Sequence, residues 1–235
     1  MSSWESGPGP DRSRPRREAA WRDILAGSLA WLSALPLVAG LLAAQHRNMN
    51  LDDNAALIVI DVQKGFADPA WGKRNNHEAE ANIARLVDAW TGSGRPIVRV
   101  RHASSGADSP LRRDAPGYAF QSVVADLAPA LDVTKSVHSA FLGTPDLRGW
   151  LETSGVRQVV ITGIQTNRCC ETTARTAGDL GYDVLFVLDA THTFDEVGPD
   201  GALVTGDQFA SVTAANIEGN FGRVVTTGDL LDAAT

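Results

Sequence analysis

The sequence VVITGIQTNRCCETTAR, residues 159–175, runs from a predicted buried strand through a short turn into a predicted helix. Val159 to Gly163 form an apolar, β-branched run of the kind that fills a buried parallel strand. Residues 172–180 are predicted as the helix. The two cysteines of the chain, Cys169 and Cys170, lie where the turn enters this helix. The stretch therefore predicts a strand–turn–helix unit with sulfur at its turn.

The position of Cys169 favours a nucleophile. The partial positive charge at a helix N-terminus stabilises a thiolate, which is the form of cysteine that attacks a carbonyl carbon. Position alone leaves two other interpretations open. In the first, both cysteines are small core residues, since free cysteine is among the most buried residue types. In the second, Cys169 and Cys170 act together as a redox sensor. Neighbouring residues rarely satisfy disulfide geometry, which disfavours the sensor.

Outward from this stretch, short apolar runs alternate with helical stretches from Ala55 onward. This alternation is typical of a doubly wound α/β fold, a mostly parallel sheet with helices on both faces. Six strands are predicted, at residues 56–60, 96–100, 133–135, 159–162, 184–188 and 224–226. Helices are predicted at residues 78–91, 145–153, 172–180 and 206–219, the second capped by Thr144 with Pro145 in its first turn.

Polar side chains stand at the ends of four of these predicted strands. They are Asp61, His102, Lys135 and Cys169. In doubly wound sheets, ligands bind beyond the carboxyl ends of the strands, where the strand order reverses. We therefore expect these four side chains to converge on one edge of the sheet. No glycine-rich GxGxxG follows the first strand, which removes the main support for a nucleotide site.

Composition narrows the class of partner. The net charge of the 235 residues is −7, which argues against a nucleic-acid binder and favours a small-molecule partner. Two adjacent cysteines make no disulfide framework, so a reducing, cytoplasmic location is expected. Neither a CxxC pair nor an HExxH helix is present, and we expect no metal and no other cofactor.

Residues 1–50 differ in composition from the remainder, residues 51–235. Residues 1–22 are rich in Pro, Gly, Ser and Arg and are predicted to be disordered. Residues 24–44 carry no charge and approach the ~20 residues that cross a bilayer, so a membrane anchor is one interpretation. Glycine, serine and proline dilute this run, and we favour a dispensable extension. A helix packed on the domain is the third possibility.

Three separated blocks of sequence carry a family resemblance. They are LIVIDVQKGF (residues 57–66), VTKSVHSAFLGTPDL (residues 133–147) and GIQTNRCCETTAR (residues 163–175). In these blocks and their order, the chain resembles the isochorismatase-like cysteine hydrolases over about residues 55–231. One block alone would be a weak signal, whereas three in order are specific.

This resemblance implies a role for each of the polar residues. Cys169 would be the nucleophile, Asp61 the general base that takes its proton, and Lys135 the cation that holds carboxylate and sulfur in register. The resemblance also implies a cis peptide bond between Ile164 and Gln165, which aims the amides of Gln165 and Cys169 into an oxyanion hole. Cys170 is interpreted as a packed core residue.

The resemblance also bears on the reaction. Isochorismatases proper cleave a vinyl ether without a cysteine at this position, so Cys169 points to the amidase branch. The implied reaction is attack on an amide, ureido or carbamoyl carbon, followed by hydrolysis of a thioester. Nicotinamidases of the family carry a metal-binding Asp-x-His and a further histidine after the second strand. Here that segment has His102 alone, so neither a catalytic metal nor nicotinamide is expected.

The substrate pocket is less well specified. Candidates for its wall are Phe66, Trp71, His102, Tyr118 and Phe141, although aromatic residues are more often core and a lone histidine is as often structural. His138 and His192 share that ambiguity. The resemblance implies a homo-oligomer, with membrane contact only if residues 24–44 are an anchor. Three alternative functions remain: an isochorismatase-type ether hydrolase, a non-catalytic scaffold and a thiol redox sensor.

Overall fold

The computed structural model describes residues 49–234, and a sheet of six parallel strands forms its centre. The strands lie in the order β3-β2-β1-β4-β5-β8. Their bounds are β1 (Ala56–Ile60), β2 (Ile97–His102), β3 (Leu131–Lys135), β4 (Gln158–Ile164), β5 (Asp183–His192) and β8 (Arg223–Val225). The predicted six-stranded, doubly wound α/β fold is therefore confirmed, with each predicted strand at its expected place.

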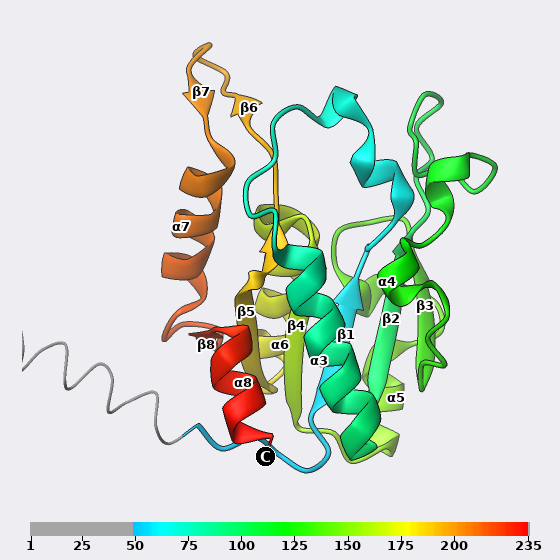
Figure 1. Cartoon of the computed structure of the whole chain (residues 1–235), viewed down its shortest axis with the longest axis vertical. Helices are drawn as coiled ribbons and strands as arrows, with labels where there is room; N and C mark the ends of the chain where they lie inside the picture. The colour runs from blue at the N-terminus through cyan, green and yellow to red at the C-terminus, as the bar shows by residue number, and fades with distance from the viewer. Residues whose placement is uncertain (1–48, 235) are drawn as a thin grey trace, which may run out of the picture. The chain divides into compact units, whose positions relative to one another are not determined.

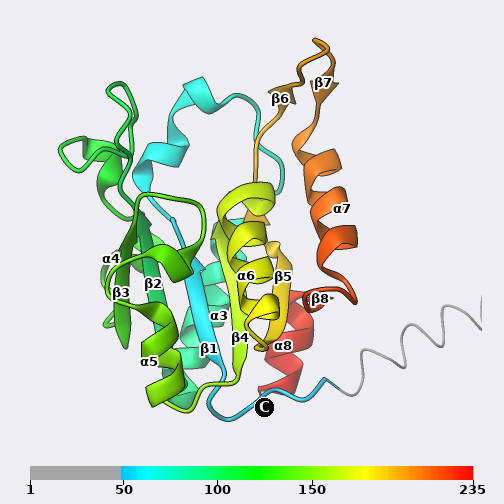
Figure 2. The ribbon, with the colours of Figure 1, turned by 180° about the vertical axis from the view of Figure 1, so that it is seen from behind.

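Helices cover both faces of the sheet. One face carries α3 (Ala79–Ser93), α4 (Ser122–Ala125) and α8 (Thr227–Ala233), and the other carries α5 (Leu147–Thr153), α6 (Glu171–Asp179) and α7 (Gly206–Ile217). Figure 1 shows α3 and α8 in front of the sheet, and Figure 2 shows α5 and α6 in front of its opposite face. Side chains of β1 alternate between the two cores, Ile58 in one and Val59 in the other, so the strand is apolar throughout.

Short elements complete the described chain. They are η1 (Lys64–Ala67), η2 (Pro69–Trp71), η3 (Pro116–Tyr118), η4 (Ala140–Leu142), the π-helical turn η5 (Thr166–Cys170) and the antiparallel pair β6 (Glu196–Val197) and β7 (Leu203–Val204). Sequence reasoning missed this pair and α8. Helix α8 begins with a capping box, in which the Thr226 hydroxyl accepts from the Asp229 N–H at 3.2 Å.

The predicted cap of α5 was wrong. Helix α5 begins at Leu147, and the side chain of Asp146 accepts a hydrogen bond from the Arg148 N–H at 3.1 Å. Thr144 lies further upstream, where its backbone exchanges two hydrogen bonds of 2.8 Å with Thr134 of β3. Thr144 therefore extends the edge of the sheet and cannot cap the helix, and Pro145 precedes the first turn.

The strand order reverses at the centre of the sheet. The chain passes from β1 to β2 and β3 on one side, then returns to β4 and continues to β5 and β8 on the other. Strands β1 and β4 are neighbours, with Ile60 opposite Gly163. The crevice that binds ligands in such folds forms beyond the carboxyl ends of these two strands. Asp61 follows β1 there, and η5 follows β4.

No helix among residues 49–234 combines the length and apolar content needed to cross a bilayer. The predicted disordered leader, residues 1–22, and the uncharged run, residues 24–44, lie outside the described residues. The anchor and the dispensable extension both stay predictions.

Candidate active site

The backbone at the switch point brings β4 unusually close to β1. Gly163 has a φ of +124°, and a side-chain Cβ there would lie 2.0 Å from the carbonyl oxygen of Ile60. Only glycine fits this contact. On the facing strand, Asp61 also has a positive φ, +55°, and its N–H donates to the Val100 carbonyl at 2.9 Å. These two features place the Asp61 side chain at the carboxyl edge, beside the turn that carries Cys169.

Lys135 joins the predicted catalytic residues into one cluster. Its Nζ lies 2.5 Å from Asp61 Oδ2 and 3.3 Å from Cys169 Sγ. A third contact, at 3.2 Å, goes to Nδ1 of His102. The structure therefore brings together all four polar residues expected at this edge, although they come from four different strand ends.

The Asp61 and Lys135 side chains form an ion pair that is sealed from solvent, with both side chains 0% exposed. Burial works to lower the pKa of the Lys135 ammonium, but the Asp61 carboxylate and the Cys169 sulfur outweigh it, and that pKa is raised. Lys135 therefore stays charged. Asp61 Oδ1 is buried and accepts no hydrogen bond from the described residues, so one carboxylate oxygen is held and the other is free.

The resting sulfur is a thiol. Burial raises the pKa of Cys169 to about 12, the Asp61 carboxylate adds to this rise, and Lys135 only partly opposes it. The helix N-terminus was expected to favour a thiolate. That expectation is wrong, because desolvation and the neighbouring carboxylate together raise the pKa of the thiol. Attack by this sulfur at neutral pH requires that its proton leave during the reaction. Asp61, which has an unpartnered Oδ1 and a carboxylate oxygen within 4.8 Å of the sulfur, is the carboxylate of this cluster that could take it.

A metal ion does not fit among these residues. Asp61, His102 and Cys169 each offer a ligand atom, and the three atoms lie within 4.8 Å of one another. The Lys135 ammonium already lies within hydrogen-bonding distance of all three residues, in the place that a cation would need. Burial, followed by the charge of Lys135, lowers the pKa of His102, so its ring is neutral at pH 7 and accepts from Lys135.

Sequence reasoning missed one residue of the site, Gln63, and left another, His138, ambiguous. Gln63 is buried, its Nε2 donates to the carbonyls of His102 (3.0 Å) and Tyr118 (3.1 Å), and its Oε1 accepts from the His102 N–H (2.8 Å). It thereby fixes the loop after β2. His138 is exposed, and its Nδ1 lies 3.7 Å from Cys169 Sγ. Both lie inside the blocks that carried the family resemblance, which was the available signal.

Gln165 lies at the start of the nucleophile turn, and the peptide bond between Ile164 and Gln165 is cis. Its carbonyl accepts hydrogen bonds from the N–H groups of Arg168 (3.2 Å) and Cys170 (3.1 Å). The side-chain Nε2 of Gln165 is buried and donates to no acceptor among the described residues. A free amide donor therefore lies next to the turn, whereas the oxyanion hole built from the Gln165 and Cys169 amides stays a prediction.

The predicted pocket aromatics separate into three groups. The rings of Phe66 and Trp71 contact each other in a tilted arrangement, with centroids 5.1 Å apart, and Phe66 packs with Ile164 beside the cis bond. Tyr118 lies under the guanidinium of Arg101 at 4.7 Å. The structure does not bring Phe141 to the site: its ring packs on Tyr182 at 5.9 Å, next to the amino end of β5. Phe141 therefore lies in the α5–α6 core.

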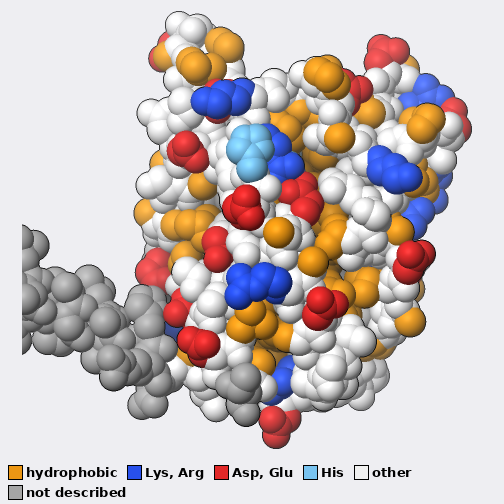
Figure 3. Space-filling model, viewed as in Figure 1, with side chains coloured by type: hydrophobic (Ala, Val, Ile, Leu, Met, Phe, Trp, Pro, Cys, Tyr) orange, Lys and Arg blue, Asp and Glu red, His pale blue; other side chains and the backbone are white. Residues whose placement is uncertain are grey.

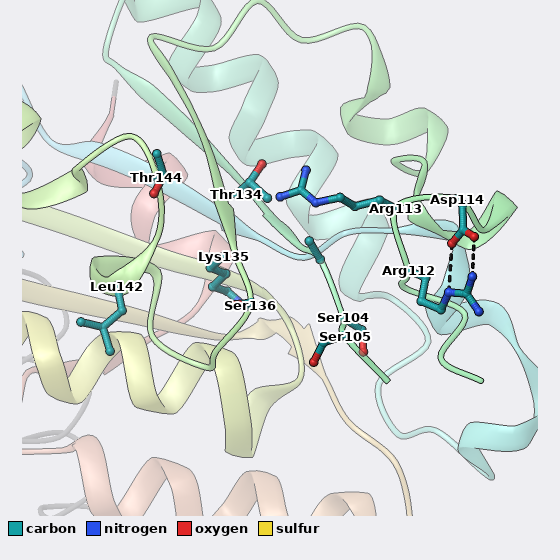
Figure 4. A pocket seen from close by; sticks show the side chains of 11 residues that line it. Ser104, Ser105, Arg112, Arg113, Asp114, Thr134, Lys135, Ser136, Leu142 and Thr144 are labelled. Atoms are coloured by element: carbon teal, nitrogen blue, oxygen red, sulfur yellow. Dashed lines mark hydrogen bonds and ion pairs between the residues drawn. The ribbon is translucent and has the colours of Figure 1, made fainter. Parts of the chain in front are cut away.

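A cavity of about 730 Å³ lies beside Lys135, between the loop after β2 and the end of β3. Figure 4 shows Arg113 reaching toward Thr134, while Arg112 turns to Asp114, which it binds in an ion pair. Among residues 49–234, Arg113 has no carboxylate partner and contacts only Tyr118. The remaining lining consists of the Asp114 carboxylate, the apolar Ala103 and Leu142, and residues with hydroxyl groups, which are Ser104, Ser105, Thr134, Ser136 and Thr144.

Basic side chains concentrate over this part of an acidic protein. Figure 3 shows Lys and Arg gathered at the upper right of the face, over the loop between β2 and α4. That loop and the end of β2 supply Arg101, Arg112 and Arg113. The same loop carries Asp108 and Asp114, and Asp114 pairs with Arg112, so Arg113 is the arginine of the cavity lining that has no carboxylate partner among the described residues.

Comparisons with known proteins bear on the family to which the chain belongs. The model of the Isochorismatase domain matches residues 55–217. The chain is 32% identical over 182 residues to the isochorismatase family protein YrdC of Bacillus subtilis, covering 77% of this chain and 97% of YrdC. It is 36% identical over 219 residues to the ureidoacrylate amidohydrolase RutB of Enterobacter sp. (strain 638), covering 77% and 90%. An isochorismatase-family structure from Chromobacterium violaceum superposes with a TM-score of 0.75 at 34% identity, covering 79% of this chain and 96% of that one.

Proposed function

The chain belongs to the isochorismatase family of hydrolases, and from this premise we propose that it is a cysteine hydrolase that cleaves a C–N bond. Its substrate is a small amide, ureido or carbamoyl compound. One observation carries the proposal: Lys135 Nζ lies 2.5 Å from Asp61 Oδ2 and 3.3 Å from Cys169 Sγ at the switch point of the sheet. In this proposal, the nucleophile Cys169 and the base Asp61 both contact the cation that orients them.

Acylation follows from the protonation states of the cluster. Cys169 Sγ attacks the carbonyl carbon while its proton passes to the free Oδ1 of Asp61. Lys135 occupies Oδ2, which leaves Oδ1 as the carboxylate oxygen that accepts this proton. The C–N bond then breaks, Asp61 returns the proton to the departing nitrogen, and the acyl group remains on Cys169 as a thioester. Water hydrolyses this thioester to the acid.

The oxyanion formed during attack needs hydrogen-bond donors. In this proposal it is stabilised by the amides of Gln165 and Cys169, and the unpartnered Nε2 of Gln165 is a further donor within the same turn. A buried donor without an acceptor costs stability in the free protein. The formation of charge on the substrate oxygen would satisfy it, so its contribution would be greatest in the transition state.

The cavity beside Lys135 supports a substrate with an anionic end. Arg113 is free of carboxylate partners among the described residues and reaches into the cavity, whose lining also holds hydroxyl groups and the Asp114 carboxylate that pairs with Arg112. Ureidoacrylate, the compound in the name of the RutB relative, combines a ureido group with a carboxylate. Nicotinamide has no charge to place beside Arg113. A ureido or carbamoyl compound with a carboxylate is therefore the preferred substrate class.

Ammonia release from a panel of compounds tests the function. The panel pairs anionic ureides, ureidoacrylate and N-carbamoylglycine, with neutral amides such as nicotinamide and acetamide. We expect turnover of at least one anionic ureide, its loss in Cys169→Ala, and its retention in the matched control Cys170→Ala, because Cys170 is fully buried. Equal activity of Cys169→Ala would contradict the proposal, and hydrolysis of a vinyl ether instead would support the isochorismatase-type alternative.

The remaining alternatives predict different outcomes. A scaffold protein would release no ammonia from any compound. A redox sensor would form a reversible bond between Cys169 and Cys170 under mild peroxide, and it would show no dependence on Asp61. We further propose a homo-oligomer in the cytoplasm that binds a small molecule and no nucleic acid; size-exclusion chromatography with light scattering measures the number of subunits.

A further inference from the structure

His138 lies against the reacting sulfur from the solvent side. Its Nδ1 is 3.7 Å from Cys169 Sγ, and its side chain is exposed. The loop that carries it is tied to α6 on its C-terminal side, where Ser139 Oγ donates to Thr176 Oγ1 (3.0 Å) and the Ala140 N–H donates to Thr173 Oγ1 (3.1 Å). Helix α6 also continues directly from the turn of Cys169, so imidazole and sulfur share one support.

The other groups around the sulfur are occupied or sealed. Asp61 is 0% exposed and Lys135 is 2% exposed. His102 is engaged by Lys135 through its Nδ1. The imidazole of His138 makes one hydrogen-bonding contact among the described residues, and that contact is with the sulfur itself. Of the basic groups in the cluster, His138 is therefore the one that water meets first.

We propose that His138 is the general base of deacylation, the step in which water cleaves the thioester; this inference rests on the proposed function. The imidazole takes a proton from the attacking water at Nδ1 as the new C–O bond forms. The C–S bond then breaks and its electron pair stays on Cys169 Sγ. The imidazolium returns the same proton to Sγ, which regenerates the thiol, and the product leaves as an acid.

The two half-reactions then use different bases for a physical reason. The thiol proton lies in the sealed interior, where the free Oδ1 of Asp61 takes it and gives it to the departing nitrogen. The second reactant, water, arrives from bulk solvent on the exposed side of the sulfur, where His138 lies. A base that contacts both water and sulfur can take the proton from water and pass it to the sulfur without a second carrier.

The probe for this step is p-nitrophenyl acetate, which acetylates a reactive cysteine without requiring the natural substrate. In wild type we expect a burst of p-nitrophenolate followed by steady turnover. His138→Gln keeps the burst, because acylation uses Asp61, but its steady turnover falls by about 10²–10⁴-fold, the usual contribution of a general base. Mass spectrometry then finds the acetyl group accumulated on Cys169. Free imidazole in the buffer restores turnover of His138→Gly.

A matched control is His77→Gln, since His77 is an exposed histidine outside the cluster, and it keeps both phases. A wild-type rate of deacylation in His138→Gln, with the burst intact, would overturn the role of His138 and leave the proposed function standing. A burst that survives in Cys169→Ala, or no acetyl-enzyme in any variant, would instead contradict the proposed function and this step with it.

Discussion

The ammonium of Lys135 and the carboxylate of Asp61 are 2.5 Å apart, 74 residues apart in sequence, and both are closed off from solvent. The isolated charge of either one would be costly in the interior, and each is tolerated because the other is present. Removing one partner therefore affects stability as well as chemistry.

Lys135→Met leaves Asp61 buried without its counter-ion. Breaking a buried ion pair in this way costs about 3–5 kcal/mol of the free energy of unfolding, measured by urea denaturation at pH 7. Ammonia release is lost as well. Arg148→Met, which removes an exposed ion pair with Glu152, serves as control and leaves the urea midpoint unchanged. An unchanged midpoint in Lys135→Met would contradict the burial of the pair.

Asp61→Asn separates the acidity of the sulfur from its catalysis. The Asp61 carboxylate contributes to raising the pKa of Cys169 to about 12, so its removal lowers that pKa. We expect Cys169 of Asp61→Asn to react faster with iodoacetamide at pH 9 than wild type does, because more thiolate is present. Ammonia release nevertheless falls by about 10²–10⁴-fold, since the base is gone. Slower alkylation in the variant would refute this electrostatic account.

The raised pKa of Cys169 also predicts how stability changes with pH. The unfolded thiol ionises near its ordinary value of 9.0, whereas the folded thiol keeps its proton up to about pH 12. Its contribution to stability is present below pH 9 and is lost as pH rises toward 12, at up to about 1.4 kcal/mol per pH unit. Denaturation at pH 8 and pH 10.5 measures this loss. Cys169→Ala has no thiol at this position, so its free energy of unfolding should fall by less between the two pH values. Parallel losses in both proteins would contradict it.

Gly163→Ala tests the approach of β4 to β1. A Cβ at this position would meet the Ile60 carbonyl at 2.0 Å, and the φ of +124° disfavours any side chain. We expect destabilisation of about 4 kcal/mol or more, the range reached when a backbone contact cannot be accommodated. Gly92→Ala, where nothing lies within 4 Å, is the control and leaves stability unchanged or raised by up to about 1 kcal/mol.

Arg113→Gln tests the class of substrate. If Arg113 binds the anionic end, this substitution raises KM for an anionic ureide by about tenfold or more, the effect of losing a charged hydrogen bond, and leaves neutral amides unaffected. Arg85→Gln, an exposed arginine on α3, controls for the change in net charge. An equal rise in KM for anionic and neutral compounds would indicate that Arg113 acts on the shape of the loop.

The strands and the polar edge were predictable because they depend on local pattern. Runs such as residues 56–60 are apolar on both faces, and parallel strands bring their carboxyl ends to one edge, so Asp61, Lys135 and Cys169 had to lie near one another. The protonation of Cys169 was not predictable, since its pKa depends on burial and on the distance to a carboxylate from another strand.

The positions of Phe141, Thr144 and His138 were also not predictable, because they depend on contacts with residues elsewhere in the sequence. Phe141 was assigned to the pocket because of its place in a conspicuous block, but the direction of its ring is set by packing against Tyr182. Thr144 has the chemistry of a helix cap, yet its backbone pairs with Thr134. His138 was as ambiguous as any exposed histidine until its distance to the sulfur was known.

The covalent intermediate is the central claim, and trapping it is the most direct test. Wild-type protein is mixed with an anionic ureide that it turns over, quenched in acid within the first turnovers, digested and mapped by mass spectrometry. The account predicts that the peptide containing Cys169 gains the mass of the acyl fragment, that hydroxylamine removes it, and that Cys169→Ala carries none. Full turnover with no modified Cys169 peptide, or turnover by Cys169→Ala, would contradict the account.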